Sequence, residues 1–267
     1  MTTHPWKRPV TADWNPNLYM KFEAERTRAA RDLLAQVPVD SAQTVYDLGC
    51  GPGNSVELLQ RRFPSAAVTG IDTSEALLRH ARLRAPGATF ELKDITTWTP
   101  DRPADLIFAN AALHFLPDHE VLFPRLASLL QSGGALAVQM PNIVREASHA
   151  AMRLVATEGP WAHRLVPIAK TRPVIASFEE YHDWLRPLCA DIDIWMTTYV
   201  HRLDGPGDIV DWFAGSGLRP FLDPLDETER RDFLALYKRE LEQACPAEPD
   251  GKTFLRYPRL FLVAVRK

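Results

Sequence analysis

Three alternating glycines follow an acid in the stretch VYDLGCGPG, at the end of an apolar run. Gly49, Gly51 and Gly53 lack a Cβ, so the backbone there can adopt positive φ angles and a ligand can lie directly against it. Asp47 precedes the loop, and its carboxylate would repel a phosphate but attract an ammonium group. The stretch therefore predicts a binding loop made of backbone atoms, and it favours a cationic ligand.

The spacing of these glycines argues against a bound dinucleotide. A dinucleotide fingerprint reads GxGxxG and holds a pyrophosphate at the start of a helix. Here the pattern is GxGxG, and Asn54 stands where the third fingerprint glycine would be. Asn54 and Ser55 are instead good N-cap residues for the next helix. Two alternatives stay open at this point: a glycine turn without a ligand, and an oxidoreductase or non-catalytic nucleotide-binding module.

Polar residues also end the next three apolar runs of the chain. Asp72 with Thr73, Asp94 with Ile95, and Asn110 occupy these places. The carboxylate of Asp72 can accept hydrogen bonds from both hydroxyls of a ribose, and that of Asp94 can accept from the exocyclic amine of a purine while Ile95 packs on its ring. Each acid alone is also a common loop residue or helix cap. Together with the glycine loop, they predict a nucleoside-binding row.

Alternating strands and helices are needed to bring these residues together. Apolar runs predict the strands, and segments of helical periodicity separate them. Parallel strands joined by right-handed crossovers would place the polar residues at one edge of the sheet, where such sheets bind ligands. After the strand at Val45, further strands are expected at 67–71, 89–92, 105–109 and 135–140, and helices at 56–63, 73–84 with Ser74 as cap, and 122–130, stopped by Gly133 and Gly134.

The alternation weakens after residue 141. Helices are expected at 146–158, 178–185 and 207–245 with a break at 215–224, and residues 161–173 are expected to be irregular. Two long strands, 191–203 and 254–265, are expected to pair in the antiparallel sense. We divide the chain, as one domain overall, into an arm and lid helix (1–37), a cofactor-binding core (38–141) and a helical cover with the last two strands (142–267).

An aromatic pair, Trp14 and Tyr19, stands at the entry to the first expected helix, which runs from Leu18 to Val37 and ends before Pro38. One interpretation is an aromatic anchor that fastens this helix to the domain. The other is a lid that closes over cofactor and substrate and excludes water. Residues 1–13 are expected to form a frayed arm.

Composition limits the class of protein. The chain has 267 residues, 46% of them hydrophobic, and a net charge of -3, which gives no basic excess for a nucleic acid. No apolar run spans a bilayer and no leader is visible, so no membrane association and a cytoplasmic location are expected. Its three cysteines, Cys50, Cys189 and Cys245, have no CxxC spacing, so neither a disulfide nor a bound metal is expected.

Basic and aromatic residues alternate in the expected cover. Arginine binds carboxylates through a two-pronged fork, so this composition favours a small anionic substrate, and a polycarboxylate is plausible. Most of these residues could equally be ordinary surface charges. The residues concerned are Arg164, Lys170, Arg172, Trp195, Tyr199, His201, Arg219, Arg256, Tyr257 and Arg259.

The DLGCGPG run resembles the first motif of the class I S-adenosylmethionine-dependent methyltransferases, and the likeness extends over residues 40–141. The segments DWNP, AERTRAA, FANAALHFLPDH, LAVQMPN, DIWMTTYVH, GLRPFL and YPRLFLVAVR look like the trans-aconitate methyltransferases of bacteria, from Asp13 to Arg266. This resemblance implies an α/β, Rossmann-like seven-stranded fold, with a mostly parallel sheet, one antiparallel edge strand and a helical cover. It also implies S-adenosyl-L-methionine as cofactor, S-adenosyl-L-homocysteine as product and a monomethyl ester of trans-aconitate or a similar small polycarboxylate.

The expected chemistry needs positioning and no catalytic acid or base. A carboxylate is already ionised at pH 7, and a sulfonium methyl group is already electrophilic. The remaining alternative on this fold is C- or O-methylation of an aromatic or lipid substrate, which predicts a poised base and an apolar cover. Whether the chain is a monomer or a homodimer stays open.

Site residues follow from these arguments. We expect cofactor contacts from Tyr19, Asp47, Gly49, Gly51, Gly53, Asp72, Thr73, Asp94, Ile95 and Asn110. We expect substrate contacts from Trp14, His114, Tyr199, Arg219 and Arg256, with His114 orienting the substrate or, alternatively, capping a helix.

Overall fold

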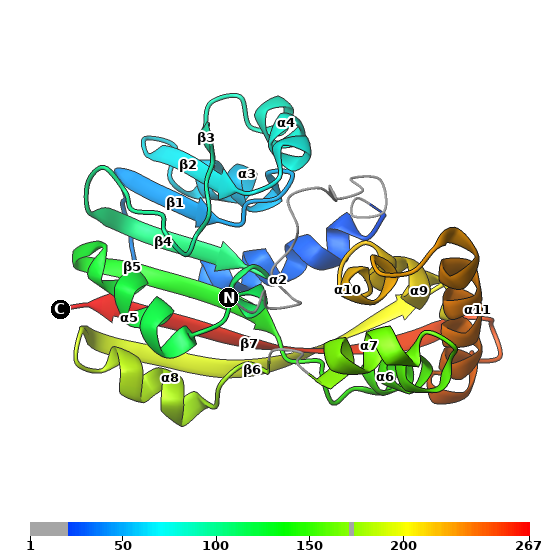
Figure 1. Ribbon diagram of the computed structural model, residues 1–267. Coiled ribbons are helices and arrows are strands. Elements are labelled where there is room, and N and C mark those ends of the chain that lie inside the picture. The colour runs from blue at the N-terminus through cyan, green and yellow to red at the C-terminus, as the bar shows by residue number, and fades with distance from the viewer. Residues whose placement is uncertain (1–20, 171–173) are drawn as a thin grey trace.

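A seven-stranded sheet forms the centre of the computed structural model, which describes residues 21–170 and 174–267 (Figure 1). Trp14 and Tyr19 lie outside the described residues, so their expected roles stay predictions. The strand order is β3-β2-β1-β4-β5-β7-β6. The strands are β1 (Thr44–Leu48), β2 (Ala67–Asp72), β3 (Thr89–Leu92), β4 (Ala104–Asn110), β5 (Leu130–Pro141), β6 (Cys189–Leu203) and β7 (Thr253–Arg266).

Strands β1 to β5 are parallel, whereas β7 is antiparallel to both β5 and β6. The predicted fold class is confirmed, with one refinement: the antiparallel strand is not the edge strand but lies between β5 and β6. The reason is apolar content. Residues 260–264 of β7 are all buried, as a central strand requires, whereas β6 alternates acids with apolar residues and suits an edge.

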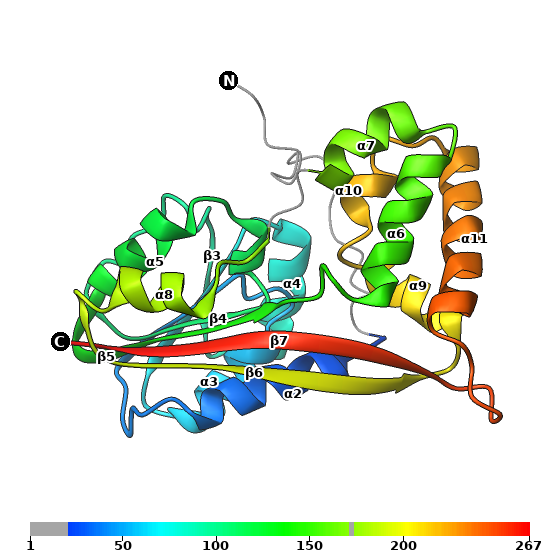
Figure 2. The same ribbon diagram turned by 90° about the horizontal axis from the view of Figure 1, so that it is seen from below.

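Helices cover both faces of this sheet (Figure 2). Helices α2 (Glu23–Ala35) and α3 (Asn54–Arg62) share one apolar cluster with β1, β4 and β7. Helices α5 (His119–Ser128) and α8 (Phe178–Leu185) share the other.

A second group of helices stands beyond the ends of the parallel strands. It comprises α6 (Ala147–Glu158), α7 (Ala162–Lys170), α9 (Pro206–Ala214), α10 (Arg219–Leu222) and α11 (Glu227–Ala244). Strands β6 and β7 extend past the sheet to reach it, as the yellow and red arrows in Figure 2 show. Trp161, Trp212, Phe221 and Phe233 are each at most 1% exposed and form its core. The long strands therefore fasten this helical cover to the sheet.

Local expectations were confirmed in most places and wrong in three. Ser74 caps α4 (Glu75–Arg84) as predicted, because its hydroxyl accepts the Leu77 N–H. The start of α3 differs: its N-cap is Gly53, which has φ 91°, and Asn54 instead donates to the Thr27 hydroxyl. A hydrogen bond to the neighbouring helix α2 has replaced local capping by Asn54 here.

Two further differences concern proline and glycine. Residues 162–170 form helix α7 despite Pro167, because Leu165 and Ile168 lie on one buried face of that helix. Helix α5 ends at Ser128, before Gly133 and Gly134, and these glycines lie inside β5. In both places tertiary packing outweighs the local preference.

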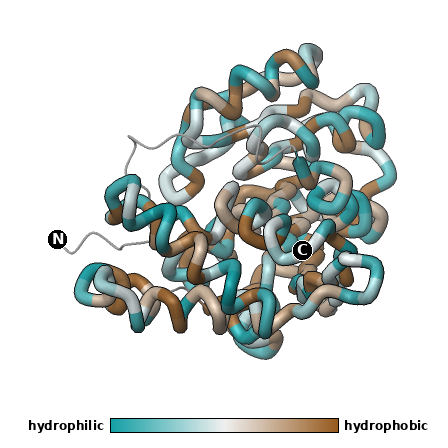
Figure 3. The backbone as a smooth tube through the Cα atoms, turned by 90° about the vertical axis from the view of Figure 1, so that its right-hand side faces the viewer, coloured by the Kyte–Doolittle hydropathy of each residue, from teal (hydrophilic) through white to brown (hydrophobic). Residues whose placement is uncertain are grey.

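Hydropathy alternates along the outer helices, whose tube shows successive teal and brown segments (Figure 3). This is the pattern of helices with one apolar face toward a core. Within residues 21–170 and 174–267, no helix combines the length and the apolar character that a membrane crossing requires.

Candidate active site

The glycine loop adopts the backbone shape predicted from its sequence. Gly49, Gly51 and Gly53 have φ angles of 71°, 55° and 91°. The N–H groups of Gly49 and Cys50 both donate to the Ile71 carbonyl, which ties the start of the loop to the end of β2. A Cβ on Gly49 would lie 2.4 Å from the Ala112 Cβ, whereas a Cβ on Gly51 would meet no atom within 4 Å. Gly49 therefore allows close packing, and Gly51 borders open space.

The carboxylate of Asp72 joins this loop to the next helix. One oxygen accepts the Gly51 N–H and the other accepts the Ser74 N–H, both at 2.9 Å. Thr73 lies between these anchored positions and is exposed. Asp72 thus stands beside the glycine loop, as the predicted ribose contact requires, and its two hydrogen bonds also hold the loop in shape.

Asp47 is the most deeply buried acid of the site, with 1% of its surface exposed. Burial, reinforced by the charge of Asp72, raises the pKa of this carboxyl well above its usual range. Its Oδ2 has no hydrogen-bond partner among the described residues. A cationic group placed nearby would stabilise the ionised form, so this position suits the amino group of a bound ligand.

Asp94 and Ile95 continue the row at the end of β3. Asp94 is exposed, and its Oδ1 accepts from the backbone N–H and the hydroxyl of Thr96. Ile95 is buried, with its Cδ1 3.9 Å from the position of a Cβ on Gly49. The structure thus brings Ile95 against the glycine loop and leaves Asp94 at the solvent edge.

The end of β4 is strained. Ala111 has φ 55°, which is uncommon for a residue with a Cβ, and its N–H donates to the Gln139 carbonyl. The Oδ1 of Asn110, just before it, is buried without a hydrogen-bond partner among the described residues. Backbone strain of this kind is characteristic of functional sites. This turn was missed at the level of sequence, where alanine gives no signal for a positive φ.

A pocket opens between this turn and the helical cover. His114 and Phe115 form one wall, and their ring centres lie 3.9 Å apart with the ring planes tilted by 38°. The pocket is lined by His114, Phe115, Pro141, Asn142, Ile143, Val144, Ile175, Phe213, Ser216, Gly217 and Tyr257. His114, expected to orient the substrate, therefore lies in a pocket at the carboxyl ends of β4 and β5.

Three other expected substrate residues do not line this pocket. Tyr199 is 3% exposed, and its hydroxyl donates to the Asp32 carboxylate at 2.6 Å. Arg219 begins α10, after the pocket residues Ser216 and Gly217. Arg256 is exposed on the face of β7 opposite to Tyr257. The period of two along a strand separates neighbours that composition alone had grouped.

Buried polar residues that were not among the expected site residues lie behind the pocket wall. Arg259 is 3% exposed, and its Nη1 donates to Gln139 Oε1 at 2.9 Å. Its Cζ lies 4.4 Å from the centre of the Tyr257 ring. Because side chains two residues apart on a strand share a face, Tyr257 and Arg259 could have been grouped from the sequence once β7 was assigned.

Comparisons with known proteins address the whole chain. A family model described as a methyltransferase domain matches residues 45–134. The trans-aconitate 2-methyltransferase of Methylobacterium nodulans is 54% identical over 255 residues, which is 96% of this chain and 99% of that protein. That of Variovorax paradoxus is 50% identical over 256 residues, with 96% and 99% covered.

This chain belongs to the trans-aconitate 2-methyltransferase family. The family predicted from the sequence motifs is confirmed, and so is its enzyme class, a methyltransferase. Solved structures agree on the fold. The YcgJ protein of Bacillus superimposes with a TM-score of 0.59 at 11% identity, over 90% of this chain and 98% of that one. A Haemonchus contortus N-methyltransferase bound to S-adenosylhomocysteine gives 0.55 at 15% identity, over 90% and 52%.

The described residues fit the cofactor that the trans-aconitate 2-methyltransferase family implies, S-adenosyl-L-methionine. Open space beside Gly51 leaves room for a ligand against the backbone. The unpaired buried oxygen of Asp47 suits an ammonium group, and Asp72 offers carboxylate oxygens at the next strand end. These protein groups therefore suit a nucleoside that carries a cationic end.

Proposed function

We propose that this protein transfers a methyl group from S-adenosyl-L-methionine to a carboxylate of trans-aconitate. The observation that supports this is the 54% identity to a trans-aconitate 2-methyltransferase over 96% of the chain. That match includes the helical cover, which the shared methyltransferase fold does not constrain. The identity therefore extends to the helices beside the pocket, and this supports the same small-molecule substrate.

The residues of the chain would divide the work by strand end. Gly49, Gly51 and Gly53 would lie against the amino-acid part of the cofactor, Asp47 near its amino group and Asp72 near its ribose. Thr73, Asp94, Ile95 and Asn110 would continue the contacts along β2, β3 and β4. When bound, the cofactor supplies an electrophilic methyl group.

Positioning is the contribution that we assign to the pocket. A substrate carboxylate is already ionised at neutral pH, so no general base is required. His114 and Phe115 would orient it from one wall, and Tyr257 from the other. The charge of the attacking oxygen is lost in the transition state, so strong pairing of that oxygen with a cation would slow the reaction.

An endpoint methylation assay tests this proposal. Labelled S-adenosyl-L-methionine would be offered with trans-aconitate, cis-aconitate, citrate or isocitrate, and the product treated with base. We expect a strong preference for trans-aconitate and a base-labile product, which identifies a methyl ester. Binding of S-adenosylhomocysteine without transfer to any of the four acids would refute the substrate and leave the methyltransferase class intact.

A further inference from the structure

Arg259 is a buried cation directly behind two residues that line the pocket, Pro141 and Tyr257. On β7 it stands in register with Pro141 of β5, and Pro141 lines the pocket. Its guanidinium donates to Gln139 Oε1 at 2.9 Å and lies 4.4 Å from the centre of the Tyr257 ring, another pocket residue. The hydrogen bond and the ring hold the guanidinium from two sides, so its orientation is fixed.

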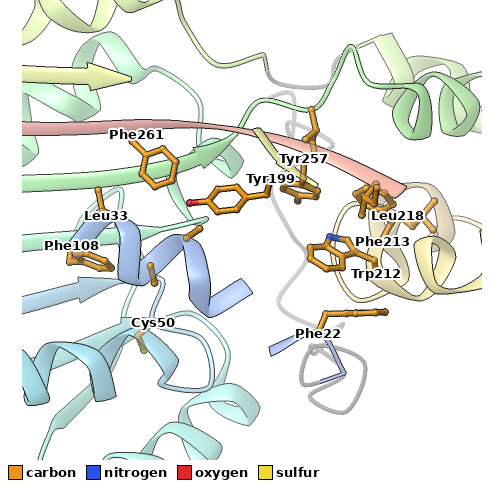
Figure 4. Packing of buried hydrophobic residues seen from close by; sticks show 14 of the residues in the cluster. Phe22, Leu33, Cys50, Phe108, Tyr199, Trp212, Phe213, Leu218, Tyr257 and Phe261 are labelled. Carbon is orange, nitrogen blue, oxygen red and sulfur yellow. The ribbon is translucent and has the colours of Figure 1, made fainter. Parts of the chain in front are cut away.

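The surroundings of Arg259 are aromatic and polar. Figure 4 shows Tyr199 and Tyr257 between Phe261 on one side and Trp212 and Phe213 on the other. The Arg259 Cζ also lies 5.7 Å from the centre of the Tyr199 ring. On this face of the β6–β7 pair, the buried Arg259 thus lies between aromatic rings and next to the pocket.

Positive charge is concentrated here. Burial, together with the charges of Arg259, Arg28 and Arg26, lowers the pKa of His201 to about 4. A neutral His201 adds no charge at pH 7, so the local charges are those of the arginines and of the Asp32 carboxylate, which accepts from the Tyr199 hydroxyl. A guanidinium at 3% exposure has little water around it, and its attraction for an anion is correspondingly strong.

We propose that Arg259 binds a carboxylate of the substrate, and that this carboxylate is one that is not methylated. The inference rests on the proposed function and names the residue that selects a polycarboxylate. The planar guanidinium matches two carboxylate oxygens, and Gln139 and Tyr257 hold it ready. The partner is an unreactive carboxylate because a tight ion pair with the reacting oxygen would oppose the loss of its charge.

Uniform binding of this kind affects KM more than kcat. An interaction that is equally strong in the ground state and in the transition state lowers KM without raising kcat. We therefore expect Arg259→Met to raise the KM for trans-aconitate on the order of 100-fold, with kcat within a few-fold of wild type.

The direct test is substrate binding to the full chain saturated with S-adenosylhomocysteine, measured by calorimetry. Arg259→Met is expected to weaken trans-aconitate binding on the order of 100-fold while affinity for S-adenosylhomocysteine stays unchanged. Arg256→Met, on the opposite face of the same strand, is expected to bind both ligands as wild type does. Arg239→Met, on the exposed side of α11, is the control for loss of an arginine.

A second variant keeps the test decisive if Arg259→Met does not fold. Gln139→Glu would place a carboxylate against the Arg259 Nη1, where Gln139 Oε1 accepts at present. It is expected to raise Tm and to weaken trans-aconitate binding at least 10-fold, because the internal carboxylate competes with the substrate. Unchanged affinity in Gln139→Glu would contradict the proposal as firmly as unchanged affinity in Arg259→Met.

The outcomes separate the two proposals. If wild type binds S-adenosylhomocysteine but not trans-aconitate, both the proposed substrate and this role of Arg259 are wrong. If wild type and Arg259→Met bind trans-aconitate equally, only the role of Arg259 is wrong. Weaker binding of S-adenosylhomocysteine in Arg259→Met, with substrate affinity intact, would place Arg259 at the cofactor and overturn the inference.

Discussion

The glycine loop and the β6–β7 pair, the two regions to which we assign ligand contacts, are built by different physical means. The loop presents backbone atoms, and its shape depends on three glycines within five residues and on two hydrogen bonds to the Ile71 carbonyl. The β6–β7 pair presents side chains such as Tyr199 and Arg259, whose places depend on strand register with residues 58 or more positions away. The first site is local in sequence, and the second is assembled by tertiary structure.

The largest expected effect lies in the loop. Gly49→Ala would combine a positive φ of 71° with a methyl group 2.4 Å from the Ala112 Cβ. We expect the free energy of unfolding to fall by about 3 kcal/mol, from backbone strain plus overpacking. Urea denaturation measures this.

Gly51→Ala is the matched control for that variant. It shares the positive φ, at 55°, but its methyl group would meet no protein atom within 4 Å. Only about 1 kcal/mol of strain is expected, whereas affinity for S-adenosylhomocysteine should fall at least 10-fold because the methyl group enters ligand space. Wild-type affinity in Gly51→Ala would show that the loop does not contact the cofactor.

The next largest effect is expected at Asp72. Asp72→Ala removes the acceptor of the Gly51 and Ser74 N–H groups and the proposed ribose contact. We expect S-adenosylhomocysteine to bind more weakly by about 2 kcal/mol, measured by calorimetry. Asp94→Ala, at the exposed end of the same row, should cost less than about 1 kcal/mol. Equal losses in both variants would remove the distinction between an anchor of the loop and a solvent-edge contact.

A change at Tyr199 tests the β6–β7 pair in the same way. Tyr199→Phe deletes the hydroxyl that donates to Asp32 and keeps the buried ring. We expect the free energy of unfolding to fall by about 1 kcal/mol, because a hydrogen bond to a carboxylate at the surface is lost. The KM for trans-aconitate should not change. A raised KM at wild-type stability would return this hydroxyl to the substrate site.

The smallest effect concerns pH. The pKa of His201 falls from its ordinary value of 6.5 to about 4 on folding, so between these values the unfolded chain binds more protons. Stability conferred by neutral His201 is therefore fully present above pH 6.5 and is lost as pH falls toward 4. At pH 6 the loss is under about 1 kcal/mol. Thermal unfolding of His201→Gln between pH 5 and 7 should show a shallower dependence on pH than wild type.

Strand ends and helix periodicity made most of the core predictable. Asp72 and Asn110 end β2 and β4 as their apolar runs indicated, because a buried parallel strand must be continuously apolar and then meet water. Two places, one in the core and one in the cover, were harder to predict. Pro167 within α7 and Gly133 within β5 are exceptions to local rules that packing overrides.

The substrate side shows the same limit in single residues. Composition grouped Arg256 with Tyr257 and Arg259, but a strand turns successive side chains to opposite faces. Arg256 is consequently exposed, while Arg259 is buried against Tyr257. Arg164, another basic residue of the cover, pairs with Glu229 and donates to the Pro224 carbonyl, so it holds α7 to α11.

The amino-acid sequence by itself determined the glycine loop, the acids at the strand ends and the family, because these depend on residue types at short and regular spacing. Only the tertiary structure decided which cation is buried beside the pocket residue Tyr257 and which alanine packs against the loop. Gln139 and Arg259 are 120 residues apart and meet only because β7 inserts between β5 and β6. Contacts of that kind arise from strand register across the sheet, which no local pattern encodes.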